Sequence, residues 1–323
     1  MRWDERLQWE IDGTTRYACV YRPPNAAIGG RPLVLFFHPG GVGANVAEQE
    51  TLLLDKAAAY DLGEPGDTGF VLAVVQGRNL HFPTVAPRDG RHHDFYHRDL
   101  GQPSTNPDIK SADTLVDALV AEGSVRADRI YVMGWSNGAF FGQLYAIARH
   151  DTPTAGGHRV AAAAVFAAAS PFDNIEYDPF GDVAYSGPSC KLASIPASTV
   201  PIQLTHRTSD LAVPCGASDA ACFGNEPGYV TSSWLSDAAS ALPGLEGRLI
   251  GGVEPGNMLD APAKQCANVD SSCNVESCIE NRNGVHCLCL VNHLRWPDGA
   301  YPMGMGIDNE PAMLDFLRMH ALL

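Results

Sequence analysis

The sequence has little positive charge and no long hydrophobic run. Its 323 residues include 22 Lys and Arg against 37 Asp and Glu, which gives a formal net charge of -15. Nucleic-acid binding relies on clustered Lys and Arg that neutralise phosphates, so this balance argues against a nucleic-acid partner. No apolar stretch approaches the roughly 20 residues of a membrane-spanning helix, so we expect no membrane partner. The hydrophobic share of 45% is ordinary for a globular protein, and we expect a soluble one.

Signals that would divide or export the chain are also missing. No linker-like change in composition and no internal repeat separates one part from another. We therefore expect residues 1–323 to form a single domain, and the protein to be a monomer. The first four residues lack the basic start and apolar core of a signal peptide. If the protein is exported, we expect this sequence to be its mature form.

Cysteine, in contrast, is abundant. The nine cysteines fit an oxidising compartment, where disulfides stabilise polar segments that bury too little apolar surface. We therefore expect a secreted or periplasmic protein with a disulfide-rich insertion at about residues 255–290. A zinc site is the alternative, but the cluster has no C-x-x-C pair and matches no common finger spacing. The odd number predicts at least one free thiol, with Cys19 as the first candidate. The others are Cys190, Cys215, Cys222, Cys266, Cys273, Cys278, Cys287 and Cys289.

The hydrophobic pattern predicts strands that alternate with helices. Short apolar runs such as residues 33–37 are typical of strands covered on both faces, and crossover connections between them indicate a mainly parallel sheet. We therefore expect an α/β fold whose central sheet is flanked by helices. Other strands are predicted at residues 16–22, 70–75, 130–133, 161–168, 202–205 and 248–251, and helices at 46–60, 108–122, 140–148, 230–241 and 310–321.

A long polar and aromatic segment, residues 77–107, follows the predicted strand 70–75. In open α/β sheets ligands bind at the carboxyl ends of the strands, so this segment is placed to line a pocket. His92, His93 and His97 within it suggest metal ligands. No carboxylate-histidine pattern of a known site accompanies them, and we expect no metal.

Residues 134–138, Gly-Trp-Ser-Asn-Gly, match the G-x-S-x-G pattern between a predicted strand and a predicted helix. There a serine occupies a strained strand-to-helix turn that exposes its hydroxyl, and the glycines avoid a Cβ clash where the turn closes. Ser136 is therefore the candidate nucleophile. Such a hydroxyl needs a base to take its proton and a carboxylate to orient that base.

The acid is expected between Ser136 and the base, because in sheets of this type the chain order is Ser, then Asp or Glu, then His. Asp210, just past the predicted buried strand 202–205, has the required position. A turn-forming aspartate is the alternative interpretation of Asp210. Asp182 and Asp219 are weaker candidates, since neither follows a convincing buried strand.

Three histidines downstream of Asp210 are candidate bases. His320 lies in the predicted terminal helix, where the helix dipole favours it, and His286 lies inside the cysteine cluster. His293 follows a short apolar run and precedes a loop with Pro and Gly, which is the position expected of a loop-borne base. It is the predicted base.

Acyl transfer also needs an oxyanion hole. One donor is the backbone N-H of Asn137, directly after the nucleophile, and the other is expected in the loop of residues 38–43 after an early strand. Pro39 has no N-H, so we predict Gly40, with Gly41 as the alternative. This loop lacks the lysine of a P-loop and the spacing of a dinucleotide fingerprint, so phosphate binding is set aside.

In these motifs and their order, the chain resembles secreted α/β-hydrolase esterases, namely bacterial feruloyl esterases and polyhydroxybutyrate depolymerase-like proteins. The resemblance implies an α/β-hydrolase fold, and it covers residues 15–320 in motif order. Departures are Pro39 and Arg207 in place of glycines, and one residue inserted between His293 and Trp296. The matching segments are residues 38–40 for the oxyanion loop, 134–138 for the nucleophile, 206–214 for the acid and 292–297 for the base.

The resemblance implies a Ser-His-Asp esterase that needs no cofactor and forms an acyl-enzyme. We expect a feruloyl or acetyl ester of a plant polysaccharide as substrate, with a polyhydroxyalkanoate or other polyester as the alternative. Trp135 and Trp296 are candidates to stack on the substrate, or else belong to the core. A different class of function is a noncatalytic binding protein on the same fold, which would have no need of the three residues in this order.

Overall fold

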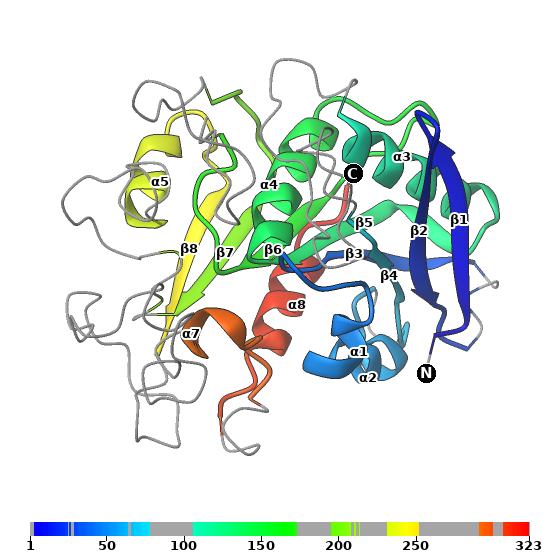
Figure 1. The fold of residues 1–323 in the computed structure, drawn as a ribbon, viewed down its shortest axis with the longest axis horizontal. Helices are drawn as coiled ribbons and strands as arrows, with labels where there is room; N and C mark the ends of the chain where they lie inside the picture. The colour runs from blue at the N-terminus through cyan, green and yellow to red at the C-terminus, as the bar shows by residue number, and fades with distance from the viewer. Residues whose placement is uncertain are drawn as a thin grey trace.

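The computed structural model describes residues 3–24, 26, 29–63, 66–77, 106–172, 195–207, 210, 213, 231–251, 291–299 and 306–322. Within them, an eight-stranded sheet has the order β1-β2-β4-β3-β5-β6-β7-β8 (Figure 1). The strands are β1 (Glu5–Ile11), β2 (Thr14–Tyr21), β3 (Arg31–Phe37), β4 (Val71–Val75), β5 (Val125–Trp135), β6 (Ala162–Phe166), β7 (Ile202–Arg207) and β8 (Leu245–Ile250).

Most of this sheet is parallel. β3 pairs in parallel with both β4 and β5, and the parallel pairing continues from β5 through β6 and β7 to β8. β1 and β2 form an antiparallel hairpin, and β2 joins β4 in antiparallel register. β4, β6 and β7 are buried along their whole length, as expected for strands covered on both faces.

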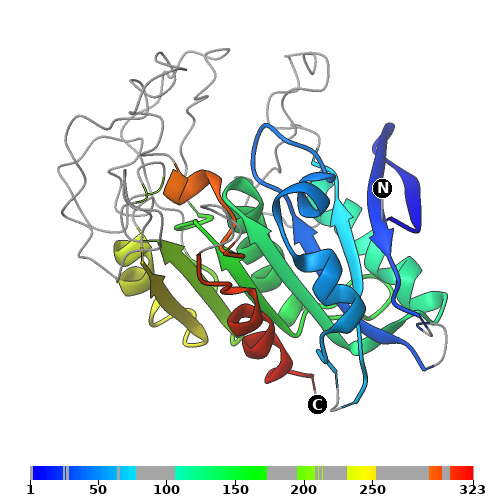
Figure 2. The same cartoon turned by 90° about the horizontal axis from the view of Figure 1, so that it is seen from below.

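Helices cover both faces of the sheet, and Figure 2 shows them on its two sides. A hydrophobic core lies on each face of the sheet. Successive side chains of β5 belong alternately to one core and the other, because successive strand side chains point to opposite faces. Ile130 and Val132 pack with α3 and α4, whereas Tyr131 and Met133 pack with α2 and α8. The helices are α1 (Val46–Glu50), α2 (Leu53–Ala59), α3 (Pro107–Ala121), α4 (Asn137–His150), α5 (Thr231–Ala238), α7 (Val291–Leu294) and α8 (Glu310–Arg318).

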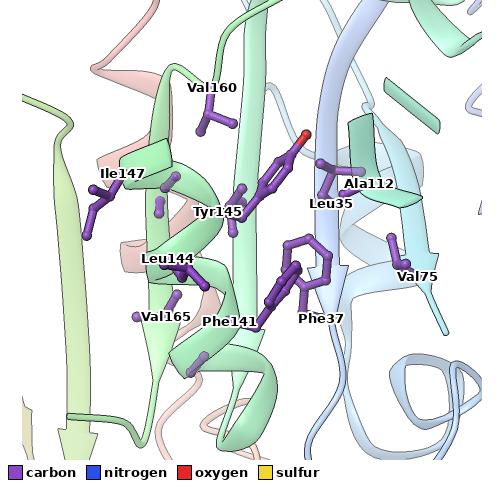
Figure 3. Close-up of a cluster of buried hydrophobic side chains, with 14 of the residues drawn as sticks. Leu35, Phe37, Val75, Ala112, Phe141, Leu144, Tyr145, Ile147, Val160 and Val165 are labelled. Atoms are coloured by element: carbon purple, nitrogen blue, oxygen red, sulfur yellow. The ribbon is translucent and has the colours of Figure 1, made fainter. Parts of the chain in front are cut away.

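Helix α4 is attached to the sheet by a tight aromatic contact. Its Phe141 meets the ring of Phe37 edge-on at 4.8 Å between centroids, and Tyr145 lies 5.8 Å from the same ring (Figure 3). These side chains are completely buried, at 0% exposure for all three. The contact fixes the start of α4, which carries the serine turn, against the end of β3.

This sheet order, with parallel strands and helices on both faces, fits the α/β-hydrolase fold. The predicted parallel strands all have counterparts, with ends that differ by a few residues. β8 begins earlier than predicted, at Leu245, and β1 is not predicted at all. The disulfide-rich insertion, residues 255–290, and most of the segment 77–107 lie outside the described residues, as does every cysteine except Cys19, whose thiol is free.

The prediction of one helix over residues 46–60 is wrong. Two helices, α1 and α2, occupy the segment, because Thr51 adopts an extended conformation with φ -140° and ψ 163°. Its hydroxyl accepts the backbone N-H of Leu53 at 3.2 Å and donates to the carbonyl of Ala47, so it bonds to both helices at the break. Among the described residues, no helix is long and apolar enough to cross a membrane.

Candidate active site

Ser136 occupies the sharp turn between β5 and α4. Its backbone has φ 53° and ψ -122°, a conformation that is strained for a residue with a side chain. Only Asp12 and Ala167 share a positive φ among the non-glycine residues that the structure describes. The strained turn lifts the hydroxyl at the carboxyl end of the strand, as the G-x-S-x-G pattern predicts.

The two glycines beside the serine make this turn possible. A Cβ on Gly134 would lie 2.3 Å from the carbonyl oxygen of Gly138, so the turn closes on itself at this point. A Cβ on Gly138 would lie 2.1 Å from the carbonyl oxygen of Phe37 and 2.5 Å from that of His38. Gly138 therefore lets the serine turn rest directly against the end of β3, where the predicted oxyanion loop begins.

Gly138→Ala is expected to destabilise the protein by about 3 kcal/mol, because the new methyl group meets backbone atoms that cannot rotate away. Gly123→Ala is the control, since Gly123 has φ +82° but an added Cβ meets nothing within 4 Å. Backbone strain alone is expected to cost about 1 kcal/mol there. Urea denaturation compares the two variants, and equal losses would contradict the close approach.

The structure brings Ser136, His293 and Asp210 together in one hydrogen-bonded chain. Ser136 Oγ lies 2.6 Å from His293 Nε2, and His293 Nδ1 lies 3.0 Å from Asp210 Oδ2. Because a carboxylate only accepts, Nδ1 carries the proton and donates it to Asp210. Nε2 is then the acceptor for the serine hydroxyl. The imidazole thus has the tautomer that a general base for Ser136 requires.

Asp210 is held as a buried anion. Burial by itself would raise the pKa of its carboxyl, but the neighbouring His293, with its hydrogen bond, and His206 lower the pKa below its ordinary value. The backbone N-H of Val213 also donates to Asp210 Oδ1 at 3.0 Å. His206 Nε2 in turn donates to the Val213 carbonyl at 2.8 Å, and burial lowers the pKa of this imidazole. His206 therefore holds, through Val213, the loop that presents the charged Asp210.

The loop that contains Gly40 is tied at both ends to the end of β4. The backbone N-H of Gly77 donates to His38 Nε2 at 3.0 Å, so the imidazole proton is on Nδ1, which donates to the Pro39 carbonyl at 2.7 Å. The side-chain nitrogen of Gln76 lies 3.1 Å from His38 Nε2, and its side-chain oxygen accepts the backbone N-H of Ala44 at 2.9 Å. Asn137, the other predicted oxyanion donor, is the first residue of α4.

Trp135 and Trp296, the candidates for substrate stacking, both lie in the interior. Their exposed fractions are 3% and 2%, and their ring centroids are 6.0 Å apart. Trp135 Nε1 donates to the backbone carbonyl of His293 at 2.8 Å. Trp296 packs edge-on against Phe36 and Phe166. The structure therefore favours the core alternative for both residues.

No known family model and no curated protein matches the sequence. Among solved structures, esterase 2 of the Planctomycetes species Thermogutta terrifontis with propionate bound has 16% sequence identity and a TM-score of 0.44, over 76% of this chain and 81% of that chain. The Bacillus cereus carboxylesterase has 12% identity and a TM-score of 0.39, over 72% of this chain and 83% of that chain. Both similarities are distant, so the chemistry of the site is inferred from its own geometry.

A buried carboxylate, Glu310 at the start of α8, supports the segment that carries His293. Its Oε1 accepts the indole N-H of Trp296 at 2.6 Å and the backbone N-H of Leu52 at 3.0 Å. Lys56 Nζ lies 2.8 Å from the other oxygen. Burial raises the pKa of the Glu310 carboxyl to about 7, although Lys56 and Trp296 act to lower it. This residue was not a sequence candidate.

Glu310 is expected to make stability depend on pH. A carboxyl whose pKa is raised from 4.5 to about 7 stabilises the fold fully below pH 4.5, and this contribution is lost as the pH rises through about 7. The loss amounts to about 3 kcal/mol. Glu310→Gln is expected to remove this part of the pH dependence in urea denaturation between about pH 4 and about pH 8. The exposed Glu10→Gln control should keep it, and an unchanged slope in Glu310→Gln would refute the assignment.

In the part of the chain that the structure describes, several sequence candidates for the acid, the base or a metal site are not found at the Ser136 site. Asp182, Asp219, His286, His92, His93 and His97 lie outside the described residues. His320 follows α8 and contacts the ring of Phe316 at 4.7 Å between centroids. Sequence reasoning missed the supporting roles of Gln76, His206 and Glu310. For His206 and Gln76 a signal existed, since each is a polar residue at the carboxyl end of a buried strand.

Proposed function

We propose that the protein is a serine carboxylic-ester hydrolase that works through an acyl-enzyme. The observation that carries this proposal is the hydrogen-bonded chain from Asp210 through His293 to Ser136. A noncatalytic binding protein has no need of a strained serine beside a correctly oriented imidazole and a buried anion. Asp210 and Ser136 lie 83 and 157 residues before His293 in the sequence, yet the fold brings all three into hydrogen-bond contact. This arrangement is the one that nucleophilic catalysis by a serine requires.

In the proposed first step, Ser136 Oγ attacks the ester carbonyl carbon while His293 Nε2 takes the hydroxyl proton. The imidazolium stays bound to Asp210, whose negative charge stabilises it. Collapse of the tetrahedral intermediate breaks the carbon–oxygen bond to the alcohol, which leaves with the proton from His293. A water molecule then attacks the acyl-enzyme with His293 again as base, and releases the acid and Ser136.

The negative oxygen of the tetrahedral intermediate needs donors that are already in place. We assign this role to the backbone N-H groups of Gly40 and Asn137. The helix dipole favours negative charge at the start of α4. The contact of Gly138 with the carbonyls of Phe37 and His38 brings the Gly40 loop next to this helix end. His38 and Gln76 keep that loop in a fixed conformation, as preorganised stabilisation requires.

For the substrate we propose a feruloyl or acetyl ester of a plant polysaccharide, and for the location the outside of the cell or the periplasm. The resemblance of the four motifs to secreted feruloyl esterases supports the substrate class. The nine cysteines support the oxidising compartment. Serine, histidine and aspartate supply the whole of this chemistry, so the proposed reaction requires no cofactor.

A panel of esters tests the proposal. Methyl ferulate, p-nitrophenyl acetate, p-nitrophenyl butyrate and polyhydroxybutyrate are incubated with the protein, and acid release is measured. Hydrolysis of the small esters is expected, and methyl ferulate as the best substrate would support the feruloyl assignment. A fluorophosphonate should label Ser136 covalently, as located by peptide mass mapping. Cleavage of no ester would overturn the enzyme assignment, and a label on another residue would overturn Ser136 as the nucleophile. Nine free thiols on non-reduced mass mapping would overturn export.

A further inference from the structure

The segment that carries His293 cannot hold its own shape. Helix α7, Val291–Leu294, has four residues, which is a single turn. Forming one turn fixes several backbone angles for very few hydrogen bonds, so an isolated helix of this length is unstable in water. Its last carbonyl groups also lack partners within the helix. The position of the imidazole therefore depends on contacts that come from outside α7.

Two buried side chains supply those contacts by capturing carbonyl groups of this segment. The indole N-H of Trp135 donates to the His293 carbonyl at 2.8 Å. The guanidinium of Arg207 donates through Nη1 to the Arg295 carbonyl at 2.6 Å. Trp135 is the last residue of β5 and Arg207 the last of β7, so both donors project from strand ends of the rigid sheet. The views of Figures 1 and 2 place α7 at the carboxyl end of β7.

We propose that Trp135 and Arg207 are positioning residues that hold the His293 segment by its backbone, and so set the distance between the imidazole and Ser136. This inference rests on the proposed esterase function. It gives Trp135 a role in positioning the general base His293 instead of a role in stacking on the substrate. At 3% exposure its ring has almost no surface left for a substrate to touch.

Arg207 connects two parts of the site at once. It stands three residues before Asp210, and it binds the carbonyl two residues after His293. Arg207 is buried, with 1% of the residue exposed. Its guanidinium also lies over the ring of Phe166, with Cζ 5.5 Å from the ring centroid. A planar cation that both stacks and donates is suited to this position, whereas an ammonium cannot reproduce both contacts. The strand that leads to the acid thus holds the segment of the base.

Trp135→Phe is the sharpest test, because it keeps an aromatic ring and removes the N-H that binds the His293 carbonyl. A displacement of the base by about 1 Å is expected to lower kcat about 10- to 100-fold, while KM stays within about twofold. The rate of Ser136 labelling by a fluorophosphonate is expected to fall in parallel. Trp234→Phe is the matched control, since Trp234 is also fully buried and its N-H donates to Gln143 at 2.9 Å in another part of the core.

The control separates positioning from general stability. Both tryptophan variants are expected to lose a similar amount of thermal stability, but only Trp135→Phe should lose kcat. An unchanged kcat in Trp135→Phe, or an equal fall in both variants, would overturn the role of Trp135. A rise in KM at constant kcat would also overturn it, because that result indicates a contact with the substrate.

Arg207 provides a second and independent measurement. Arg207→Met removes the donor and is expected to lower kcat as Trp135→Phe does, whereas Arg207→Lys keeps a donor and should recover part of it. Equal kcat in the wild type and Arg207→Met would overturn the role of Arg207. Failure of the proposed function looks different, since the wild type itself would then hydrolyse no ester and take up no label at Ser136.

Discussion

Ser136→Ala is expected to lower kcat for ester hydrolysis about 10⁶-fold, to a rate set by the oxyanion donors and substrate binding alone. The reason is that no other hydroxyl is placed at 2.6 Å from His293 Nε2 in the described structure. The substitution removes one oxygen atom and relieves no packing contact. The backbone strain at φ 53° remains, because alanine suffers the same Cβ clash as serine.

The measurement is hydrolysis of the best ester of the panel, together with fluorophosphonate labelling. Ser111→Ala is the matched control, since Ser111 is a buried serine on α3, away from the nucleophile turn. It should retain the activity and the label of the wild type. Ester hydrolysis by Ser136→Ala at the wild-type rate would exclude Ser136 as the nucleophile, whatever the fold of the variant.

Asp210→Asn is expected to lower kcat about 10⁴-fold with little change in KM. Asparagine is nearly the same size, so the loop should keep its shape, and the Val213 N-H can still donate to the amide oxygen. The amide nitrogen, however, is a donor and cannot accept a hydrogen bond from His293 Nδ1. The imidazole then loses the partner that selects its tautomer. It also loses the negative charge that stabilises the imidazolium during the reaction.

Asp113→Asn distinguishes this effect from the loss of a buried charge in general. Asp113 is a half-buried carboxylate that pairs with Arg149 at 2.7 Å, between α3 and α4. Its substitution should lower thermal stability and leave kcat for folded protein unchanged. If both variants lost the same fraction of kcat, Asp210 would have a structural role only, and a different acid would have to orient His293.

The fold was predictable because its signals are local. Uninterrupted apolar runs such as residues 33–37 and 71–75 are typical of strands covered on both faces, and the structure buries them as expected. β1 was not predicted, although its residues alternate between partly buried and exposed, as expected for a strand at the edge of a sheet. The break between α1 and α2 lies at Thr51, whose extended backbone composition and periodicity do not reveal.

The candidate site was predictable in its main parts for a different reason. Ser136, Asp210 and His293 each stand directly after, or close to, a strand end, in the order that such folds require, and the structure places them within hydrogen-bond distance. Two of the supporting residues could not be found in this way. Arg207 contacts Arg295, 88 positions further along the chain, and Glu310 contacts Trp296, 14 positions back. Nothing in the neighbouring sequence marks such partners, because only the folded sheet brings them together.

The separation of the three residues along the chain affects when the site can form during synthesis. Ser136 is synthesised long before His293, which lies 157 residues later, and the segment of His293 binds to strand ends that come from β5 and β7. A nascent chain that has completed the serine turn therefore still lacks its base. Contacts between distant parts of a chain form late in folding. On the proposed function, a polypeptide that ends before this segment is therefore expected to hydrolyse no ester.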